Sequence, residues 1–403
     1  MLIVQKFGGT SVGDLDRIQN VANRVAATKK AGHDVVVVVS AMSGETNKLV
    51  GYAEHFSKNP ARAEMDMLLS SGERVTASLL SIALQEMGFD AEAMTGRKAG
   101  IVTDNHHTKA RIEVINPERM EQGLKKGKIL VIAGFQGVNE DGDVTTLGRG
   151  GSDLSAVAIA GALKADLCEI YTDVTGIFTT DPRIEPKAKK LERISYEEML
   201  ELASLGAKVL QNRSVELAKK LNVNLVTRSS FSDEEGTLIT KEENIMEKPL
   251  VSGIALDRNQ ARISLAGVKD RPGIASDIFN ALADAEVNVD MIIQNKAVDD
   301  TTNIDFTVPV GDLHDAKKVV ESFVASEEIQ SDSYNEDICK VSVVGVGMKS
   351  HAGVAAKAFS TMAKENININ MISTSEIKVS MVIDEKYAEL AVRSLHDAYE
   401  LDK

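Results

Sequence analysis

Short apolar runs alternate with longer amphipathic stretches from the N-terminus to about Thr240. The runs at 2–4, 35–40, 129–133 and 167–171 are aliphatic and β-branched with almost no polar alternation, which is typical of strands buried on both faces. The stretches between them place apolar residues at helical spacing. This alternation predicts an α/β sandwich with a largely parallel sheet. The expected helices span 15–30, 65–87, 153–163 and 196–221.

A polar, charged segment at 232–248 interrupts this pattern just before Pro249, and it marks the expected end of a first domain over residues 1–245. An internal repeat follows. Arg262–Val268 resembles Lys340–Val346, and Val287–Ile292 resembles Ile367–Ile372. Each copy predicts the order strand, helix, strand, strand, helix. We therefore expect two further domains, over 246–335 and 336–403.

One strand is missing from the second copy. The first copy can close with a strand near 328–331, but the second ends at Lys403 directly after its second helix. The upstream strand expected at 251–256 could fill that edge, which would make the two copies one interleaved unit. The alternative is a duplicated fold with a frayed edge, although open sheet edges are normally covered.

Composition narrows the possible partners. The chain has 403 residues, 43% hydrophobic and 26% charged, enough for two or three packed domains. Its net charge of −14 disfavours nucleic acid and anionic membrane surfaces. Any anionic ligand must therefore be held by local Lys, Arg and backbone N–H groups.

Compartment and metal content are also constrained. The longest hydrophobic blocks fall well below the ~20 residues of a membrane span, and the apolar N-terminal run is too short for a signal peptide. Cys168 and Cys339 lie far apart, without zinc-ligand spacing. We expect two reduced thiols in a cytoplasmic protein.

The first motif with chemical potential is Lys6-Phe7-Gly8-Gly9, between the first strand and a helix that starts near Asp14. Glycines let the backbone approach an anion, and the helix N-terminus and the lysine attract it. The motif matches neither of the common nucleotide-binding glycine patterns. A Gly-Gly pair can also be only a tight connection.

The second motif is Gly148-Arg149-Gly150-Gly151-Ser152-Asp153, which opens another helix. The planar guanidinium of Arg149 suits a carboxylate. Ser152 and Asp153 occupy cap or first-turn positions, so the Ser-Asp pair alone could simply cap the helix.

Two further segments carry weaker signals. Glu73 follows Gly72 inside a helical pattern, where a glycine needs a packing or functional reason; it could accept a substrate ammonium or form a surface pair with Arg74. The loop after Tyr171 holds Thr172, Asp173, Phe178 and Arg183 at a strand end, where ligands gather in parallel sheets, although Asp-Pro turn chemistry also explains it. Lys208 is weaker still.

Taken together, Lys6–Ser11, Ser71–Glu73, Gly148–Asp153, Thr172–Asp173 and Gly206–Lys208 resemble the aspartate kinases of the amino acid kinase family. The C-terminal repeats, with Asp270–Ile274 opening a helix, resemble ACT domains. The resemblance covers essentially the whole chain. It implies an amino acid kinase-like three-layer sandwich with a mostly parallel sheet, followed by two ferredoxin-like βαββαβ ACT domains. The absence of a homoserine dehydrogenase extension after Lys403 resembles the monofunctional form.

The activity implied by the resemblance is phosphoryl transfer from ATP, with Mg²⁺, to the side-chain carboxylate of L-aspartate, which opens the route to lysine, threonine and methionine. Lys6 would neutralise the transferring phosphoryl group, and Asp153 would orient Lys6. No residue is assigned as a metal ligand. The implied substrate residues are Thr46, Glu73, Arg149, Gly150, Gly151 and Ser152, and the implied nucleotide residues are Lys6, Phe7, Gly8, Gly9, Thr172, Asp173, Phe178, Arg183, Lys208 and Val209.

Regulation is implied as well. ACT pairs bind small amino acids, so lysine, threonine or both are the expected inhibitors, and the ACT domains are expected to join subunits in a homo-oligomer. The second copy lacks the proline of Arg271-Pro-Gly273, which argues against two equivalent sites. The implied effector residues are Asp270, Gly273, Ile274, Ala275, Asn288, Asp290, Gln294, Asn368 and Ile369.

Two other functions remain open at this point. Another amino acid kinase could phosphorylate glutamate, acetylglutamate or a nucleotide, but the paired ACT-like repeats and Ser71–Glu73 argue against it. A silent amino-acid sensor could keep the fold without Lys6, Glu73, Arg149 and Asp153, yet all four are present. A substrate panel and an ADP-release assay discriminate between these functions.

Overall fold

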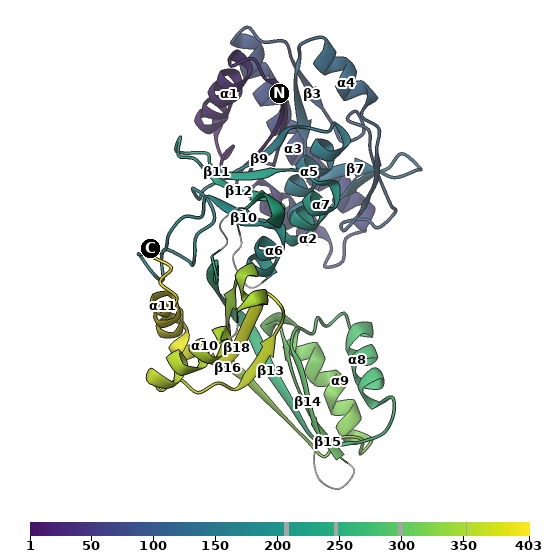
Figure 1. Cartoon of the computed structure of the whole chain (residues 1–403). Helices are drawn as coiled ribbons and strands as arrows, with labels where there is room; N and C mark the ends of the chain where they lie inside the picture. Colours follow the sequence, from purple (N-terminus) through teal and green to yellow (C-terminus); the bar gives the residue numbers. More distant parts are fainter. Residues whose placement is uncertain (205–208, 246–248, 297–300, 352) are drawn as a thin grey trace. The chain divides into compact units, whose positions relative to one another are not determined.

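The chain forms two compact units. The computed structural model describes residues 1–204, 209–245, 249–296, 301–351 and 353–403, and Figure 1 colours them along the chain from purple at the N-terminus to yellow at the C-terminus. The first unit consists of residues 1–177, 190–203 and 209–245, and the second consists of 178–189, Ser204 and the described residues from 249 onward.

The first unit is built on an eight-stranded sheet in the order β10-β12-β11-β9-β1-β2-β6-β3. Only the β11–β12 pair is antiparallel. The strands are β1 (Leu2–Phe7), β2 (Asp34–Val39), β3 (Ala91–Met94), β6 (Ile129–Ala133), β9 (Leu167–Thr172), β10 (Arg193–Ser195), β11 (Leu225–Ser229) and β12 (Thr237–Thr240).

Helices cover both faces of this sheet, which confirms the predicted three-layer sandwich. Helices α1 and α3 pack on the face of Phe7, Val37 and Val131, and α5 contacts β1, β2 and β9. The apolar runs are buried as predicted. Val35–Val39, for example, is fully buried. The helices are α1 (Leu15–Lys30), α2 (Glu45–Phe56), α3 (Arg62–Glu86), α4 (Glu118–Lys125), α5 (Gly151–Ala162), α6 (Tyr196–Ser204) and α7 (Asn212–Leu221).

A small four-stranded sheet, in the order β5-β4-β7-β8, was not predicted. Its strands have three or four residues, too few for a periodic pattern to stand out. They are β4 (Ile101–Thr103), β5 (Ile112–Ile115), β7 (Gln136–Val138) and β8 (Val144–Thr146).

The second unit contains one six-stranded antiparallel sheet in the order β14-β15-β13-β16-β18-β17. Its first repeat uses β13 (Gly253–Lys269), α8 (Ile274–Asp284), β14 (Ile292–Lys296), β15 (Thr301–Val308) and α9 (Leu313–Ala325). Its second uses β16 (Ser331–Val344), α10 (Val354–Lys364), β17 (Met371–Thr374), β18 (Lys378–Asp384) and α11 (Ala388–Ala398). Short 3₁₀ turns lie at Glu242–Asn244, Val310–Asp312, Val346–Ser350 and Glu385–Tyr387.

The two repeats share their long central strands. Gly253–Asp257, at the start of β13, pairs with Lys340–Val344 of β16, and Ile254 packs in the core of α10 and α11. The other half of β13 packs with α8 and α9. The strand upstream of the first repeat thus completes the sheet around the second, as the interleaved arrangement requires.

Four local expectations differ from the structure. Lys6 and Phe7 belong to β1, because the backbone ladder with β2 continues to Phe7. The helical pattern over 196–221 is two helices, since α6 ends at Ser204 and α7 begins at Asn212. The strand expected near 328–331 begins only at Ser331 and continues into β16.

The fourth difference is the segment 178–189, which was expected in a continuous first domain but clusters with the second unit. The physical cause is a set of hydrogen bonds to the repeats. The Ile254 N–H donates to the Thr179 carbonyl at 2.7 Å, and Arg393 Nε donates to the Ile184 carbonyl at 2.8 Å.

Cys168 and Cys339 are free and buried. None of the described helices combines the length and the apolar character that crossing a bilayer requires.

Candidate active site

Five parallel strands of the first unit end side by side. The first residue after one strand donates a backbone hydrogen bond to the last residues of its neighbour, so the ladder extends into the loops. These bonds join Gly134 to Val39 (3.0 Å), Ser40 to Phe7 (3.1 Å), Gly8 to Tyr171 (3.3 Å) and Ser230 to Thr172 (2.8 Å). The loops after β6, β2, β1, β9 and β11 therefore meet at one edge, where open parallel sheets bind ligands.

A buried ion pair lies at the centre of this edge. Lys6, near the end of β1, places its Nζ 2.5 Å from Asp153 Oδ1, and each side chain is only 11% exposed. Asp153 lies in the first turn of α5, where the helix dipole stabilises a carboxylate. The pair holds the lysine ammonium against the glycine turn, since a Cβ added to Gly8 would lie 3.3 Å from Lys6 Nζ.

The loop after β2 packs tightly between the glycine turn and α3. A Cβ on Gly9 would lie 3.1 Å from the Ala41 carbonyl oxygen, and one on Gly72 would lie 2.8 Å from the Ala41 Cβ. The glycine that interrupts the helical pattern thus has a packing reason. Its lack of a side chain brings the next residue, Glu73, up to the strand ends.

Glu73 is a buried carboxylate with one oxygen unused. The Ala41 N–H donates to its Oε1 at 3.1 Å, whereas Oε2 is buried and has no hydrogen-bond partner among the described residues. Burial raises the pKa of Glu73 to about 7, against the opposing effect of backbone hydrogen bonds. The surface pair with Arg74 is excluded, because Glu73 is only 4% exposed. Such a carboxylate suits a cationic ligand group.

We predict that Gly72→Ala weakens the protein by about 1–2 kcal/mol, because overpacking outweighs the helix preference of alanine. The displaced Ala41 N–H also raises KM for the cationic ligand of Glu73. Gly51→Ala in α2 is the matched control, since its added Cβ meets no atom within 4 Å and should stabilise the protein by up to about 1 kcal/mol. Urea unfolding of both variants checks this; equal destabilisation would contradict it.

Arg149 lies in a tight turn that carries it into solvent. Gly148 and Gly150 have φ of +75° and +74°, a left-handed conformation that side chains disfavour, and the Gly151 N–H closes the turn on the Gly148 carbonyl at 3.0 Å. Arg149 is exposed and has no ion-pair partner in the described parts of the chain. Its guanidinium is thus available to an anionic ligand.

The remaining site predictions fall into three groups. Thr46 on α2, Ser152 on α5, Thr172 at the end of β9 and Asp173 directly after it lie in the first unit, around the strand ends. Phe178 and Arg183 belong to the second unit, and the Arg183 guanidinium is paired with Asp181 at 2.7 Å. Lys208 lies outside the described residues, and Val209 is half-buried beside that gap.

Neighbouring loops also make contacts that the sequence did not predict. Ser11 Oγ lies 2.5 Å from Ser230 Oγ and joins the loops after β1 and β11. Phe7 and Tyr171 stack with ring centroids 4.6 Å apart beneath the glycine turn. Strand β11 carries Thr227 and Arg228 directly before Ser229 and Ser230, so no continuous apolar run marked this strand or its loop in the sequence.

In the second unit, the predicted effector residues lie in two places. Asp270–Ala275 follow the end of β13 that pairs with Thr301 in the first repeat, whereas Asp290 faces the second repeat. Gly273 caps α8 with φ of +96°, and Ile274 is buried. Lys340 of β16 binds the Asp290 carboxylate, and Met291 packs with Met371 of the second repeat. The exposed or half-buried remainder is Asp270, Ala275, Asn288, Gln294, Asn368 and Ile369.

Comparisons with known proteins agree with this fold and site. Residues 1–228 match the amino acid kinase family, and residues 261–327 and 341–399 each match the ACT domain. The chain therefore belongs to the amino acid kinase family, with a pair of ACT domains after the kinase fold.

Within the family it groups with the aspartokinases. It is 59% identical over 407 residues to the aspartokinase of Helicobacter pylori strain J99, covering 100% of both chains. Its fold matches Escherichia coli aspartokinase III in complex with aspartate and ADP, with a TM-score of 0.81, 26% identity and 99% of both chains covered. The lysine and aspartate complex of that enzyme gives 0.79 at 26% identity, covering 98% of this chain and 99% of the other.

Proposed function

We propose that this protein transfers the γ-phosphoryl group of ATP to the side-chain carboxylate of L-aspartate, giving 4-phospho-L-aspartate and ADP. The observation that carries the proposal is the meeting of the Lys6–Asp153 pair, the glycine turn and the unused oxygen of Glu73 at one sheet edge. The E. coli relative was solved with aspartate and ADP, the substrate and the nucleotide product of this reaction.

The amino acid is recognised by opposite charges. Its ammonium donates to Glu73 Oε2, and a carboxylate accepts from Arg149, with Thr46 and Ser152 completing the pocket. The binding of an ammonium lowers the pKa of Glu73, so aspartate binding near neutral pH releases a proton from this side chain.

The nucleotide phosphates lie against the turn after β1. The Gly8 N–H already donates to the Tyr171 carbonyl, so we assign the phosphate contact to Gly9, and we keep Phe7, Thr172 and Asp173 as nucleotide neighbours. Residues Phe178, Arg183, Lys208 and Val209 stay predictions.

Charge is the main barrier. A carboxylate 4 Å from a phosphate oxygen is repelled by about 4 kcal/mol per charge pair at an effective dielectric constant near 20. In the reaction a carboxylate oxygen of the substrate forms a bond to the γ-phosphorus of ATP. The bond between that phosphorus and the oxygen bridging it to the β-phosphate breaks, and ADP leaves with the bridging oxygen. Lys6 supplies a cation at that point, and Asp153 fixes its direction. Positioning and charge supply most of the catalysis in such transfers.

We also propose that Mg²⁺ enters with the nucleotide. This ion usually binds substrate phosphates together with one or two carboxylates, and Asp153 is the carboxylate beside the glycine turn. When bound, Mg²⁺ neutralises phosphate charge.

An ADP-release assay with purified protein tests the proposed function. Aspartate should give release that requires both ATP and Mg²⁺, whereas glutamate, acetylglutamate and nucleoside acceptors should give none. Release with glutamate instead of aspartate, or none with any acceptor, would contradict it.

For the second unit we propose feedback inhibition by lysine, threonine or both, through the predicted effector residues of the repeats, in a homo-oligomer. The edge strands β14 and β17 expose Ile292 (52%) and Ile372 (42%) at equivalent repeat positions, and such apolar edges are suited to a second copy of the chain. The free thiols are consistent with the cytoplasm.

We predict that one of these amino acids lowers activity 5–150-fold, the range of a 1–3 kcal/mol coupling. Asp290→Ala should raise the concentration needed for half-inhibition, because Lys340 loses the carboxylate that links the two repeats. Asp337→Ala, an exposed change on β16, is the control. Unaltered rate and aspartate KM with both amino acids present would dismiss the effector site.

A further inference from the structure

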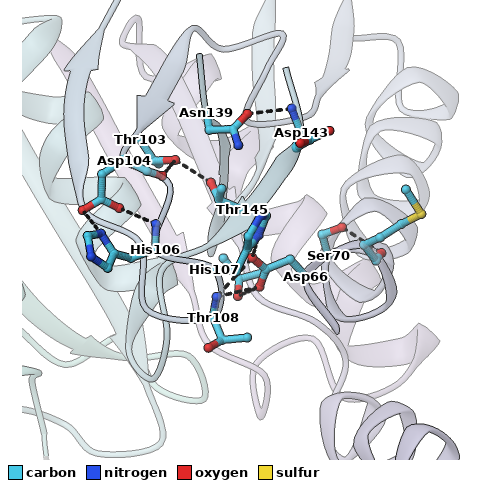
Figure 2. Close-up of polar contacts among 12 residues, drawn as sticks. Asp66, Ser70, Thr103, Asp104, His106, His107, Thr108, Asn139, Asp143 and Thr145 are labelled. Carbon is cyan, nitrogen blue, oxygen red and sulfur yellow. Dashed lines mark hydrogen bonds and ion pairs between the residues drawn. The ribbon is translucent and has the colours of Figure 1, made fainter. Parts of the chain in front are cut away.

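A fully buried carboxylate lies below the candidate site and takes no part in the steps above. Asp66 of α3 is 0% exposed. Thr108 N–H lies 3.0 Å from its Oδ1, and His107 Nδ1 lies 2.7 Å from its Oδ2 (Figure 2). The Thr146 hydroxyl donates to Oδ1. An ionised carboxylate only accepts hydrogen bonds, so His107 donates from Nδ1.

These three donors come from the segments that hold Arg149. Thr146 ends β8, directly before the Gly148–Gly150 turn. The Ala110 N–H donates to the Thr146 carbonyl at 2.9 Å, and a Cβ on Gly148 would lie 3.1 Å from the Thr108 carbonyl oxygen. The loop over 104–110 and the Arg149 turn therefore form one packed body attached to Asp66.

The same helix face carries Glu73. Asp66, Ser70 and Glu73 occupy positions i, i+4 and i+7 of α3, which point the same way. The Ser70 carbonyl accepts from Gln136 Nε2 of β7 at 2.9 Å. One helix thus holds both Glu73 and, through Asp66, the turn of Arg149.

We propose that Asp66 and His107 are positioning residues for substrate recognition: they fix Arg149 at the distance from Glu73 that matches the carboxylate and ammonium of one amino acid. This inference rests on the proposed function, in which Arg149 and Glu73 bind the substrate. A misplacement of about 1 Å between such groups costs on the order of 100-fold, so a buried clamp on the turn has a measurable effect.

Asp66→Asn is the first test, because it keeps the shape and replaces an acceptor by a donor. KM for aspartate should rise about tenfold or more, while kcat at saturating aspartate and KM for ATP stay within about twofold. KM for aspartate in His107→Gln should lie between the values of wild type and Asp66→Asn, since the glutamine amide can still donate a hydrogen bond to Asp66.

The structure offers a matched control in the same loop. Asp104 also pairs with a histidine, His106, at 3.1 Å, but that histidine side chain is 81% exposed (Figure 2). Asp104→Asn should leave KM for aspartate within about twofold of wild type. An equal rise in KM in both variants would overturn the proposal.

Two substitutions of Thr146 test the proposal if Asp66→Asn does not fold. Thr146→Val removes the buried hydroxyl and should raise KM for aspartate, and Thr146→Ser restores the donor and should restore KM. An unchanged KM for aspartate in Thr146→Val, or an equal rise in KM in Thr146→Val and Thr146→Ser, would overturn the proposal that Asp66 positions Arg149.

Amide hydrogen exchange separates this inference from the proposed function. Exchange at residues 147–151 should quicken in Asp66→Asn or Thr146→Val whether or not the wild-type chain phosphorylates aspartate. Unchanged exchange there would refute the clamp, whereas inactive wild-type protein with quickened exchange in the variant would refute only the proposed function.

Discussion

Lys6→Ala is expected to lower kcat by about 1,000-fold while the protein stays folded. The lysine offsets about 4 kcal/mol of repulsion between two anions, and each 1.36 kcal/mol is a factor of ten in rate. Its loss also leaves Asp153, now without its 2.5 Å partner, as an added negative charge beside the phosphates. Backbone pairing of β1 with β2 and β9 is unaffected by the side chain.

Two controls make this result specific to the site. Lys29→Ala removes another paired lysine, whose Nζ lies 3.0 Å from Asp34. Asp34 begins β2, at the end of the strand away from the candidate site, so this change should leave kcat within about twofold. Asp153→Asn in the Lys6→Ala background should recover stability without recovering turnover. Steady-state kinetics and thermal unfolding check both, and near-normal turnover of Lys6→Ala would remove Lys6 from the mechanism.

Glu73→Gln is expected to raise KM for aspartate by about 100-fold or more. A buried charge pair that loses one partner costs about 3–5 kcal/mol, and the amide oxygen can still accept from the Ala41 N–H. Glu86→Gln, an exposed change at the end of the same helix, is the control and should leave KM near wild type. Comparable KM values in the two variants would contradict the role of Glu73.

The raised pKa of Glu73 predicts that KM for aspartate depends on pH. With a pKa of about 7 in the folded protein, the carboxyl is protonated below neutral pH, so KM for aspartate should rise as pH falls below 7 and level off above it. Glu73→Gln should lose this dependence. A wild-type KM that is flat between about pH 5 and 8 would show that Glu73 does not bind the ammonium.

Ionisation of the Glu73 carboxyl also lowers the stability of the folded protein. Its folded-state pKa lies above the ordinary 4.5, so the folded state binds more protons than the unfolded state between these values, and stability falls as pH rises through this window. At about 1.4 kcal/mol per pH unit, the cost reaches about 3 kcal/mol on the alkaline side. Glu73→Gln should therefore be more stable than wild type at about pH 8 and similar at about pH 4.5.

Much of this architecture follows from local sequence. The runs of β1, β2, β6 and β9 are continuous and apolar, and the sites at their carboxyl ends follow from parallel pairing. The repeat likewise indicated the interleaved strand now seen at Gly253–Asp257, because an offset between similar segments survives without knowledge of packing.

The remainder depends on contacts between distant residues. Nothing near Glu73 in sequence shows that Ala41 supplies its hydrogen bond or that Gly72 is small because Ala41 lies against it. Asp66 appeared unremarkable because its donors are 41, 42 and 80 residues away. Local periodicity predicts elements, whereas these partners arise only when the elements pack.

A crystal structure with aspartate and a nonhydrolysable ATP analogue tests the central claim most directly, that the turns near residues 8 and 150 form one cleft for both substrates. The account predicts the γ-phosphate beside Lys6 Nζ and the Gly9 N–H, and the aspartate ammonium within hydrogen-bond distance of Glu73 Oε2. Either ligand seated elsewhere, for example in the cavity of about 720 Å³ lined by Arg97, Arg119 and Lys126, would contradict it.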